Sequence, residues 1–190
     1  MGKHRFDPGH AAKLDDPRRL KSEPPELVLD SLGLASPRVV VEIGAGSGYY
    51  TACLAQCMAP GGMVAACDVS EKMLAILRQK QLQGVAGLCI DHPHLPFKDQ
   101  CSDVVFAGNV LHEFDHPQAL LGEAFRLLKP GGTLGIVDWK KKDMDFGPPA
   151  SERLELTEIE ALLAGSGFGF IQAHDIVEYH NVISAAKEPR

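Results

Sequence analysis

The stretch Val39–Tyr50 most constrains what this chain can fold into, because it joins a buried strand to a helix through a glycine-rich turn. It opens with Val39-Val40-Val41-Glu42-Ile43, whose branched apolar residues favour an extended, buried strand. Gly44, Gly46 and Gly48 then break the strand, and apolar residues at helical spacing follow. This order leaves free backbone N–H groups at a helix N-terminus, where an electron-rich ligand can approach the backbone closely.

The spacing of the glycines separates this turn from the dinucleotide-binding fingerprint. The pattern is Gly-x-Gly-x-Gly, and Tyr49 stands where that fingerprint has its third glycine. A glycine-rich turn alone is weak evidence, since many nucleotide-binding folds contain one. Glu42, two residues before the first glycine, adds a carboxylate beside the turn.

Segments of strand and helix character alternate along the chain. Predicted strands cover residues 39–43, 63–67, 85–90, 103–107 and 133–137. The first intervening helix is expected to end at Pro60-Gly61-Gly62, Ser70 to cap the next, and Pro117 to open the third. Strands alternating with helices predict an α/β fold, Rossmann-like and doubly wound, with helices on both faces of a mostly parallel sheet.

The two ends of the chain differ from this repeating pattern. Residues 1–25 are polar, charged and rich in proline, so we expect either a solvated N-terminal arm or a lid over the glycine turn. Near the other end, Thr157 and Glu160 are predicted to form a capping box for a last helix. Two final strands, residues 168–173 and 176–184, predict an antiparallel edge that completes a seven-stranded sheet.

Polar side chains stand just past the predicted strands. An acid or an amide follows or ends each strand of the parallel part, in the order Glu42, Asp68, Asp91, Asn109 and Asp138. In open α/β sheets, ligands bind beyond the carboxyl ends of the strands. The sequence therefore predicts a binding site at that edge of the sheet.

Composition and charge exclude several classes of protein. The chain has 190 residues, 45% of them hydrophobic and 23% charged, which is typical of one soluble globular domain. Its net charge of −6 gives no broad electrostatic reason to bind nucleic acid. No apolar run approaches the roughly 20 residues that span a bilayer, and the first residues contain no apolar signal segment. We expect a cytoplasmic protein without nucleic-acid or membrane partners.

The five cysteines form no Cys-x-x-Cys pair, and most fall inside apolar runs. An odd number of cysteines in such positions favours buried free thiols in a reducing compartment.

Four motifs in the same order give the chain its resemblance to a known family. They are Val41-Glu42-Ile43-Gly44-Ala45-Gly46-Ser47-Gly48, Asp68-Val69-Ser70, Asp91 followed by Leu95-Pro96-Phe97, and Leu128-Lys129-Pro130-Gly131-Gly132. With these motifs the chain resembles the class I S-adenosylmethionine-dependent methyltransferases, in the branch of the ubiquinone/menaquinone-biosynthesis and arsenite methyltransferases. The resemblance covers residues 37–175, and it implies a methyltransferase domain over residues 26–190 with S-adenosyl-L-methionine as cofactor.

The resemblance implies roles for the residues of the first motif. Gly44, Gly46 and Gly48, with Ala45 between them, would let the backbone approach the methionine part of the cofactor, where a Cβ would collide with it. Glu42 would lie near the cationic amino or sulfonium end, where a carboxylate is favourable.

The same resemblance implies contacts from the following strands. Asp68 would accept hydrogen bonds from both ribose hydroxyls, and Val69 would pack on the adenine face. Asp91 would accept from the adenine amino group, with the His92 backbone N–H beside it. Asn109 lies where the family's fourth strand passes the methionine moiety.

Each of three residues also has a purely structural interpretation. Asp68 could cap the helix that follows it, a role that can coexist with ribose binding. Asp91 could be an ordinary turn residue, and Asn109 could serve only the backbone of its loop.

The sequence His112-Glu113-Phe114-Asp115-His116 matches the His-Glu-x-x-His zinc pattern, but it does not fit that chemistry. Zinc binding needs both histidines on one face of a helix, and Pro117 follows at once, so a loop entering a helix is expected. The pair His92 and His94 is interrupted by a proline in a turn. We therefore expect no metal.

Methyl transfer from a sulfonium requires alignment of nucleophile and methyl group, and in some enzymes a base. Among the polar groups near the predicted pocket, His112 is our candidate base and Asp138 its companion. Other candidates, each with an equally good structural explanation, are Glu113, Trp139, His10, Tyr179 and His180.

Three functions remain open from the sequence. The first is a methyltransferase acting on an O, N, C or S nucleophile of a small-molecule acceptor, and a homodimer is compatible with it. The second is a non-catalytic S-adenosylmethionine-binding protein or a module for a protein partner. The third, a nicotinamide-dependent oxidoreductase, is disfavoured by Tyr49 in place of a glycine.

The sequence also weighs against two acceptor classes. The Asn/Asp-Pro-Pro-Tyr motif of enzymes acting on exocyclic amines is absent, and Gly147-Pro148-Pro149-Ala150 is not equivalent to it. Cys53 and Cys57 lie one helical turn apart and are expected to face the core, which disfavours arsenic methylation.

Overall fold

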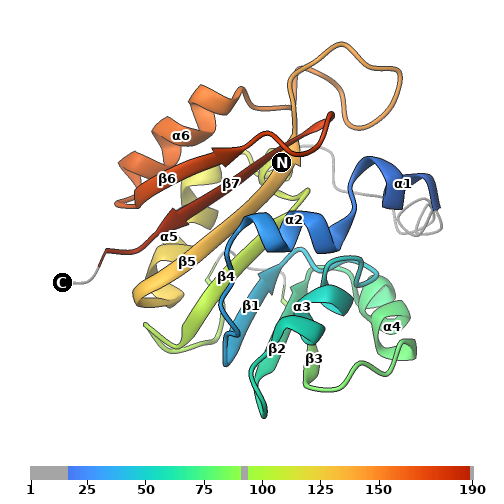
Figure 1. Cartoon of the computed structure of the whole chain (residues 1–190), viewed down its shortest axis with the longest axis vertical. Coiled ribbons are helices and arrows are strands. Elements are labelled where there is room, and N and C mark those ends of the chain that lie inside the picture. The colour runs from blue at the N-terminus through green and yellow to red at the C-terminus, as the bar shows by residue number, and fades with distance from the viewer. Residues whose placement is uncertain (1–16, 91–93, 189–190) are drawn as a thin grey trace.

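A computed structural model of the chain describes residues 17–90 and 94–188. Within them the chain forms a seven-stranded sheet in the order β3-β2-β1-β4-β5-β7-β6 (Figure 1). The strands are β1 (Val39–Ile43), β2 (Met63–Asp68), β3 (Val85–Cys89), β4 (Ser102–Gly108), β5 (Leu128–Trp139), β6 (Gly169–His174) and β7 (His180–Ala186). Strands β1 to β5 pair in parallel, whereas β7 runs antiparallel to both β5 and β6. The predicted fold class is confirmed.

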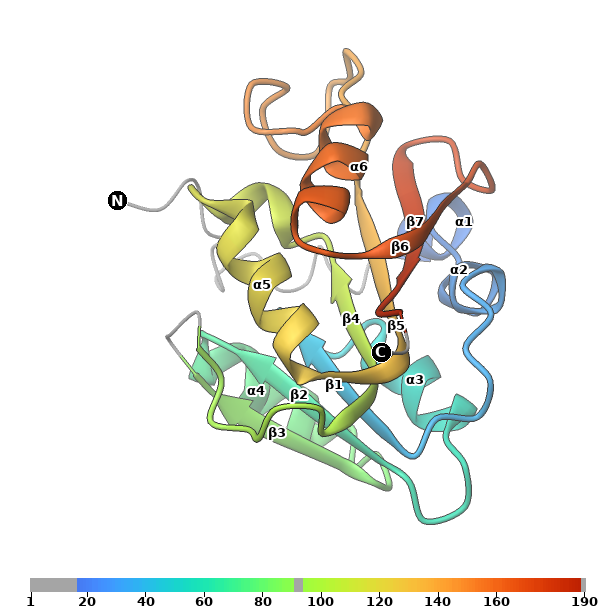
Figure 2. The ribbon, with the colours of Figure 1, turned by 90° about the vertical axis from the view of Figure 1, so that its left-hand side faces the viewer.

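Helices pack on both faces of the sheet (Figure 2). The helices are α1 (Pro17–Ser22), α2 (Pro25–Ser31), α3 (Thr51–Cys57), α4 (Glu71–Gln79), the 3-10 turn η2 (Leu111–Glu113), α5 (Pro117–Leu127) and α6 (Leu156–Gly165). In α2 to α6 apolar residues recur at helical spacing, so each of these helices buries one face, whereas Leu20 of α1 is exposed. One core lies between the sheet and α5 and α6, and the cores on the opposite face involve α2, α3 and α4.

Local signals predicted several helix boundaries correctly. The Ser70 side chain accepts a hydrogen bond from the Met73 N–H and so caps α4. Pro117 is the first residue of α5, where a missing N–H costs nothing. The helix α3, however, ends at Cys57 rather than at Pro60, because Met58 already adopts an extended backbone.

The fifth strand is longer than predicted. It begins at Leu128, which pairs with Ser102 of β4, so Lys129-Pro130-Gly131-Gly132 ends α5 but also belongs to β5. The reason is a contact distant in sequence: the Gly131 N–H donates to the Lys187 carbonyl, and the Lys187 N–H donates to the Gly132 carbonyl.

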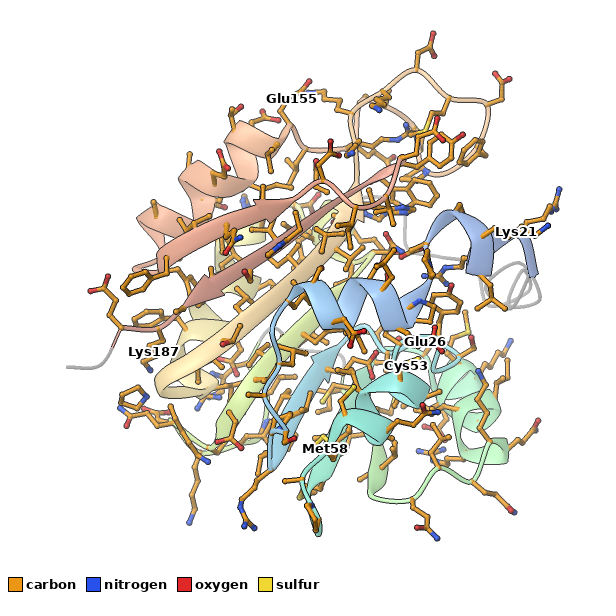
Figure 3. The ribbon with its side chains drawn as sticks, in the orientation of Figure 1. Lys21, Glu26, Cys53, Met58, Glu155 and Lys187 are labelled. Atoms are coloured by element: carbon orange, nitrogen blue, oxygen red, sulfur yellow. The ribbon has the colours of Figure 1, made fainter. Side chains whose placement is uncertain are left out.

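The predicted cap of the last helix is wrong by two residues. Glu155, not Thr157, is the N-cap, and its partner in the capping box is Glu158 rather than Glu160 (Figure 3). Glu155 has an extended backbone and its N–H donates to the Glu158 carboxylate at 2.7 Å. A glutamate thus takes the position that Ser or Thr usually occupies, and Thr157 lies inside the helix.

The last strand begins four residues later than predicted. Residues 175–179 form a bend instead of a strand, and Lys140, which directly follows β5, binds this bend. The Lys140 Nζ atom donates to the Asp175 carboxylate at 2.8 Å and to the Val177 carbonyl at 2.9 Å. Its backbone N–H donates to the Tyr179 carbonyl, just before β7 begins.

The five cysteines are free, but they are not all buried as predicted. Cys53 and Cys67 are buried, Cys57 and Cys101 are partly buried, and Cys89 is exposed on β3. The strand β3 is an edge strand of the sheet, so its side chains have no neighbouring strand on one side. Cys53 lies beside Glu26 of α2, and its burial raises the pKa of the thiol to about 12 (Figure 3).

Residues 17–25, the described part of the predicted arm, consist of α1 and the start of α2. In Figure 1, α1 lies at the end of the sheet toward which the parallel strands point. Residues 1–16, including His10, lie outside the described residues, so the division of the chain at residue 25 and the function of the arm stay predictions. No helix in the described ranges combines the length and apolar character needed to cross a membrane.

We expect Lys187→Met to destabilise the fold by about 2 kcal/mol. The Lys187 Nζ atom is buried and donates to the carbonyls of Phe125 and Leu128 at 2.7 and 2.8 Å (Figure 3). Methionine preserves the length of the side chain but leaves both carbonyls, at the end of α5, without these donors. Urea unfolding would measure the loss, with the exposed Lys72→Met as the matched control; an equal effect of both substitutions would contradict the prediction.

Candidate active site

Four of the polar residues predicted at strand ends lie at one edge of the sheet. Glu42 precedes the last residue of β1, Asp68 ends β2, Asn109 follows β4 and Asp138 lies near the end of β5. They meet there because the four strands are parallel (Figure 1). Asp91 and His92 lie outside the described residues, so their predicted roles stay predictions.

The glycine turn requires glycine for two reasons that do not involve a ligand. Gly44, Gly46 and Gly48 have φ values of 75°, 54° and 88°, in the region that favours glycine. A Cβ on Gly44 would lie 2.7 Å from a methyl group of Val110, and one on Gly48 would lie 2.3 Å from a methyl group of Leu77. The glycines therefore let the turn lie close to the protein's own side chains as well as to any bound group.

Asp68 is held rigidly against this turn. Its Oδ2 atom accepts from the Gly46 N–H at 2.7 Å and its Oδ1 atom from the Ser70 N–H at 2.8 Å. Asp68 is not itself the cap of α4, as the alternative interpretation had it, because Ser70 holds that position; Asp68 instead accepts from the N–H of the cap residue. A carboxylate has about four acceptor positions, so two backbone donors leave room for two more hydrogen bonds. Beside it, the apolar side chain of Val69 is 45% exposed, which is unusual for valine.

Glu42 is buried below the turn. Its Oε2 atom accepts from the Thr51 hydroxyl at 2.6 Å, and the residue is 2% exposed. Burial raises the pKa of Glu42 to about 8, although the Thr51 hydroxyl opposes the shift. In this structure the carboxyl group is therefore mostly protonated at neutral pH, and it would ionise readily beside a cation.

The raised pKa of Glu42 predicts a dependence of stability on pH. A carboxyl group whose pKa is higher in the folded than in the unfolded protein favours folding at low pH, and this benefit is lost as the pH rises through the folded value. The window runs from about pH 4.5 to about pH 8. Across this window the wild type should lose up to ~5 kcal/mol of its free energy of unfolding through this group. Glu42→Gln lacks the titrating group and should not show this loss.

Urea unfolding of the ligand-free proteins between pH 5 and pH 9 would measure this difference. Asp30→Asn, which neutralises an exposed acid on α2, is the matched control and should parallel the wild type throughout. If the curves of wild type and Glu42→Gln also ran parallel, the buried carboxyl group would not titrate as described.

The two predicted catalytic residues form a hydrogen-bonded pair. His112, on η2, is 5% exposed, and its Nδ1 atom lies 2.6 Å from Oδ1 of Asp138. The Asp138 carboxylate also accepts from the backbone N–H groups of His112 at 2.9 Å and Trp139 at 2.7 Å. Because a carboxylate only accepts, Nδ1 carries the proton and Nε2 has the free lone pair.

Charge and burial shift the pKa of His112 in opposite directions. Burial alone would lower the pKa of the imidazole, but the Asp138 carboxylate outweighs it and raises the pKa above its ordinary value. A histidine oriented by a carboxylate in this way is a general base of raised basicity. The second histidine of the zinc-like pattern, His116, is the N-cap of α5 and is exposed, as the predicted loop requires.

Aromatic residues gather where β5 ends: Trp139 is the last residue of β5, His180 the first of β7, Tyr179 precedes it, and Phe146 lies in the loop after β5. The centre of the Trp139 ring lies 4.2 Å from that of His180 and 6.0 Å from that of Phe146. The Phe146 ring centre lies 4.9 Å from that of Tyr179. Arg153 is buried and donates to the carbonyls of Pro148, Lys142 and Phe146, which fixes the loop against Trp139.

Sequence reasoning missed one residue that reaches the strand ends, Glu23. It follows α1 and is 1% exposed. Its carboxylate accepts from the Tyr50 hydroxyl at 2.5 Å and from Asn109 Nδ2 at 2.7 Å. In the sequence Glu23 stands in a charged, proline-rich segment, so nothing local distinguished it from its solvated neighbours.

Comparison with known proteins agrees with this geometry. Residues 41–136, just over half of the chain, match the family described as "Methyltransferase domain". A solved S-adenosylmethionine-dependent methyltransferase from Aquifex aeolicus is 32% identical, with a TM-score of 0.89 over 96% of this chain and 100% of that one. The [4+2]-cyclase SpnF, 19% identical over 89% of this chain and 81% of that one, shares the fold with a TM-score of 0.76.

Curated relatives match the same part of the chain. The ubiquinone/menaquinone biosynthesis C-methyltransferases UbiE of Burkholderia mallei and Burkholderia thailandensis are 35% identical over 105 residues. That region is 54% of this chain and 43% of theirs, so the chain matches less than half of the length of these relatives.

The fold and the strand-end site define a Rossmann-like methyltransferase domain, and the chain belongs to that family. Over residues 41–136 it is a methyltransferase domain, and the domain is of the class to which the S-adenosylmethionine-dependent enzyme from Aquifex aeolicus belongs.

Proposed function

We propose that this methyltransferase acts on a small molecule whose nucleophilic atom loses a proton during transfer, and that His112 accepts this proton. The observation that supports the proposal is the 2.6 Å contact between His112 Nδ1 and Asp138 Oδ1 at the strand ends. When bound, S-adenosylmethionine supplies a methyl group on a sulfonium, so the acceptor needs alignment and deprotonation rather than covalent activation.

The residues around the glycine turn fit the cofactor. Asp68 has acceptor capacity left for the two ribose hydroxyls, and the exposed Val69 side chain suits an adenine face. The turn of Gly44, Ala45, Gly46 and Gly48 provides backbone that a methionine moiety can approach. A carboxylate is favourable beside a cation, which supports a role for Glu42 next to the cofactor's positive charges.

Asp138 would act through His112. It holds the imidazole with Nδ1 protonated, which leaves Nε2 to accept a proton from an acceptor hydroxyl, thiol, nitrogen or acidic carbon. The carboxylate also stabilises the imidazolium that results. Glu113, on the same turn, remains an alternative base, and Trp139, Tyr179 and His180 are candidates for the wall of the acceptor site.

A carbon acceptor is the first class to test, because the relatives that cover this region are named C-methyltransferases of ubiquinone and menaquinone biosynthesis. At an aromatic carbon next to a hydroxyl, His112 would accept the hydroxyl proton as the carbon attacks the methyl group and S-adenosylhomocysteine leaves. The proton that this carbon then loses would return to the oxygen, so that the net reaction transfers one proton to His112. A homodimer, the absence of a nucleic-acid partner and a cytoplasmic location stay predictions.

A label-transfer screen would test the proposal. The wild-type protein and His112→Ala would be incubated with methyl-labelled S-adenosylmethionine and small phenols, thiols, amines and activated carbon acids. We expect transfer to a proton-bearing acceptor by the wild type and its loss in the variant. Equal transfer by both proteins would remove His112 from the reaction, and binding without transfer to any acceptor would favour a non-catalytic role.

A further inference from the structure

Glu23 is a buried carboxylate that the proposed reaction does not use. It joins α1 to α2, and three side chains from different parts of the chain donate to it. The Tyr50 hydroxyl and Asn109 Nδ2 donate to Oε1 at 2.5 and 2.7 Å, and Arg19 Nε donates to Oε2 at 2.8 Å. Burial alone would raise the pKa of Glu23, but Arg19 outweighs it and holds the pKa below its ordinary value. The group is therefore an ionised carboxylate, which only accepts hydrogen bonds.

This charge determines the orientation of the Asn109 amide. An asparagine amide has a donor end and an acceptor end, and only the donor end can face a carboxylate. With Nδ2 on Glu23, Oδ1 points the opposite way, where it is buried and has no hydrogen-bond partner among the residues that the structure describes. Leaving a buried acceptor unpaired costs about 1–3 kcal/mol, so a fixed orphan at a binding site indicates a ligand donor.

The backbone of Asn109 is also held in place. Its φ value of 56° lies in the left-handed region, and its N–H donates to the Val137 carbonyl at 2.7 Å. Both the backbone and the amide of Asn109 are thus held in place immediately after β4. Because β4 is the neighbour of β1 in the sheet, Asn109 follows a strand next to the one that leads into the glycine turn.

We propose that Glu23 is a positioning residue of the cofactor site, which turns the Asn109 amide so that Oδ1 accepts a hydrogen bond from the α-ammonium group of S-adenosylmethionine. This rests on the proposed function, in which Asn109 lies beside the methionine moiety. The ammonium group is the donor of choice because it is cationic, and a charge-assisted hydrogen bond best offsets the burial of Oδ1.

The surroundings of Glu23 hold it in this position. The Arg19 guanidinium lies 3.7 Å from the centre of the Tyr49 ring, and the Tyr49 hydroxyl donates to the Glu23 carbonyl at 2.7 Å. His180 Nε2 lies 3.6 Å from Glu23 Oε2. Through these contacts the segment that carries α1 becomes part of the site at the strand ends.

Calorimetric titration with two ligands would test the role of Glu23. S-adenosylhomocysteine carries the amino-acid part of the cofactor, whereas 5′-methylthioadenosine shares its adenine, ribose and sulfur but lacks the ammonium group. Glu23→Gln preserves the shape of the side chain but accepts either end of the Asn109 amide, so the orientation is no longer enforced. We expect about 10-fold weaker binding of S-adenosylhomocysteine, with 5′-methylthioadenosine unchanged within about twofold.

Three further proteins make the test independent of folding. Asp30→Asn removes an exposed charge from α2 and should bind both ligands like the wild type. Tyr50→Phe removes the other donor to Oε1 without touching the amide, and it should retain the selectivity between the ligands. Asn109→Gly removes the amide, and glycine adopts the left-handed backbone of this position readily. Adding Glu23→Gln to this variant should cause no further loss of S-adenosylhomocysteine affinity.

The outcomes separate this inference from the proposed function. If Glu23→Gln weakened both ligands equally, or if its effect persisted in the Asn109→Gly background, Glu23 would be structural and the inference would be overturned. Unchanged binding of both ligands to Glu23→Gln would overturn it as well, with the proposed function intact. If the wild type bound neither ligand, the cofactor site itself would be misassigned.

Discussion

His112→Ala is expected to lower the rate of methyl transfer about 1,000-fold, with little change in affinity for S-adenosylhomocysteine. General-base catalysis contributes about 10²- to 10⁴-fold in enzymes, and here the base is buried and oriented by Asp138. The imidazole is assigned to the acceptor rather than to the cofactor, so cofactor affinity should change less than threefold. Single-turnover transfer of labelled methyl to an identified acceptor would measure the rate, and calorimetry the affinity.

The exposed His116 provides a matched control on the same loop. His116→Ala should retain wild-type transfer, because this residue only precedes α5 and is solvent-exposed. Equal losses in both variants would mean that His112 supports the loop rather than the chemistry.

The pH dependence of methyl transfer is a second test of whether His112 acts as a base or only supports its loop. Only neutral His112 can accept a proton, so the rate should rise with pH through the pKa of this histidine, which Asp138 holds above its ordinary value despite burial. Asp138→Asn removes the charge but not the burial, and the rise should then move to lower pH as the maximal rate falls.

Asp68→Asn is expected to weaken the binding of S-adenosylmethionine about 100-fold. Replacing one carboxylate oxygen with an NH₂ group removes acceptor positions for the ribose and turns a donor toward the N–H of Gly46 or Ser70. Two charge-assisted hydrogen bonds at about 1.5–3 kcal/mol each are enough for such a loss. Calorimetric titration with S-adenosylmethionine would measure it.

Ser70→Ala serves as the control for Asp68. It removes the side-chain cap of α4, which Asp68→Asn also disturbs through the Ser70 N–H, but it leaves every acceptor of the carboxylate in place. Affinity within about threefold of wild type is expected. A loss as large as that of Asp68→Asn would assign the effect to the helix rather than to the ribose contact.

The parallel sheet and the position of its site were predictable because the signals are local. Branched residues before the glycine turn, Ser70 ahead of α4 and Pro117 at the start of α5 each act within a few residues. Once the strands are parallel, their carboxyl ends must meet at one edge. The pairing of His112 with Asp138 follows from that edge, although the sequence alone did not establish their contact.

The features that escaped prediction depend on contacts far apart in sequence. Glu23 and Asn109 are separated by 86 residues, and no pattern near either one indicates their hydrogen bond. The same holds for Lys187, whose backbone hydrogen bonds to Gly131 and Gly132 extend β5. The N-cap of α6 was predicted wrongly for a local reason. Glu155 is the N-cap because its backbone is extended, although glutamate has a lower preference for this position than Ser or Thr.

A crystal structure with S-adenosylhomocysteine bound would test the central claim most directly. We expect both ribose hydroxyls within hydrogen-bond distance of the Asp68 carboxylate and the amino-acid part lying against the backbone of Gly44 and Gly46. A complex in which the ribose lies beyond hydrogen-bond reach of Asp68, or in which the ligand avoids the glycine turn, would contradict it.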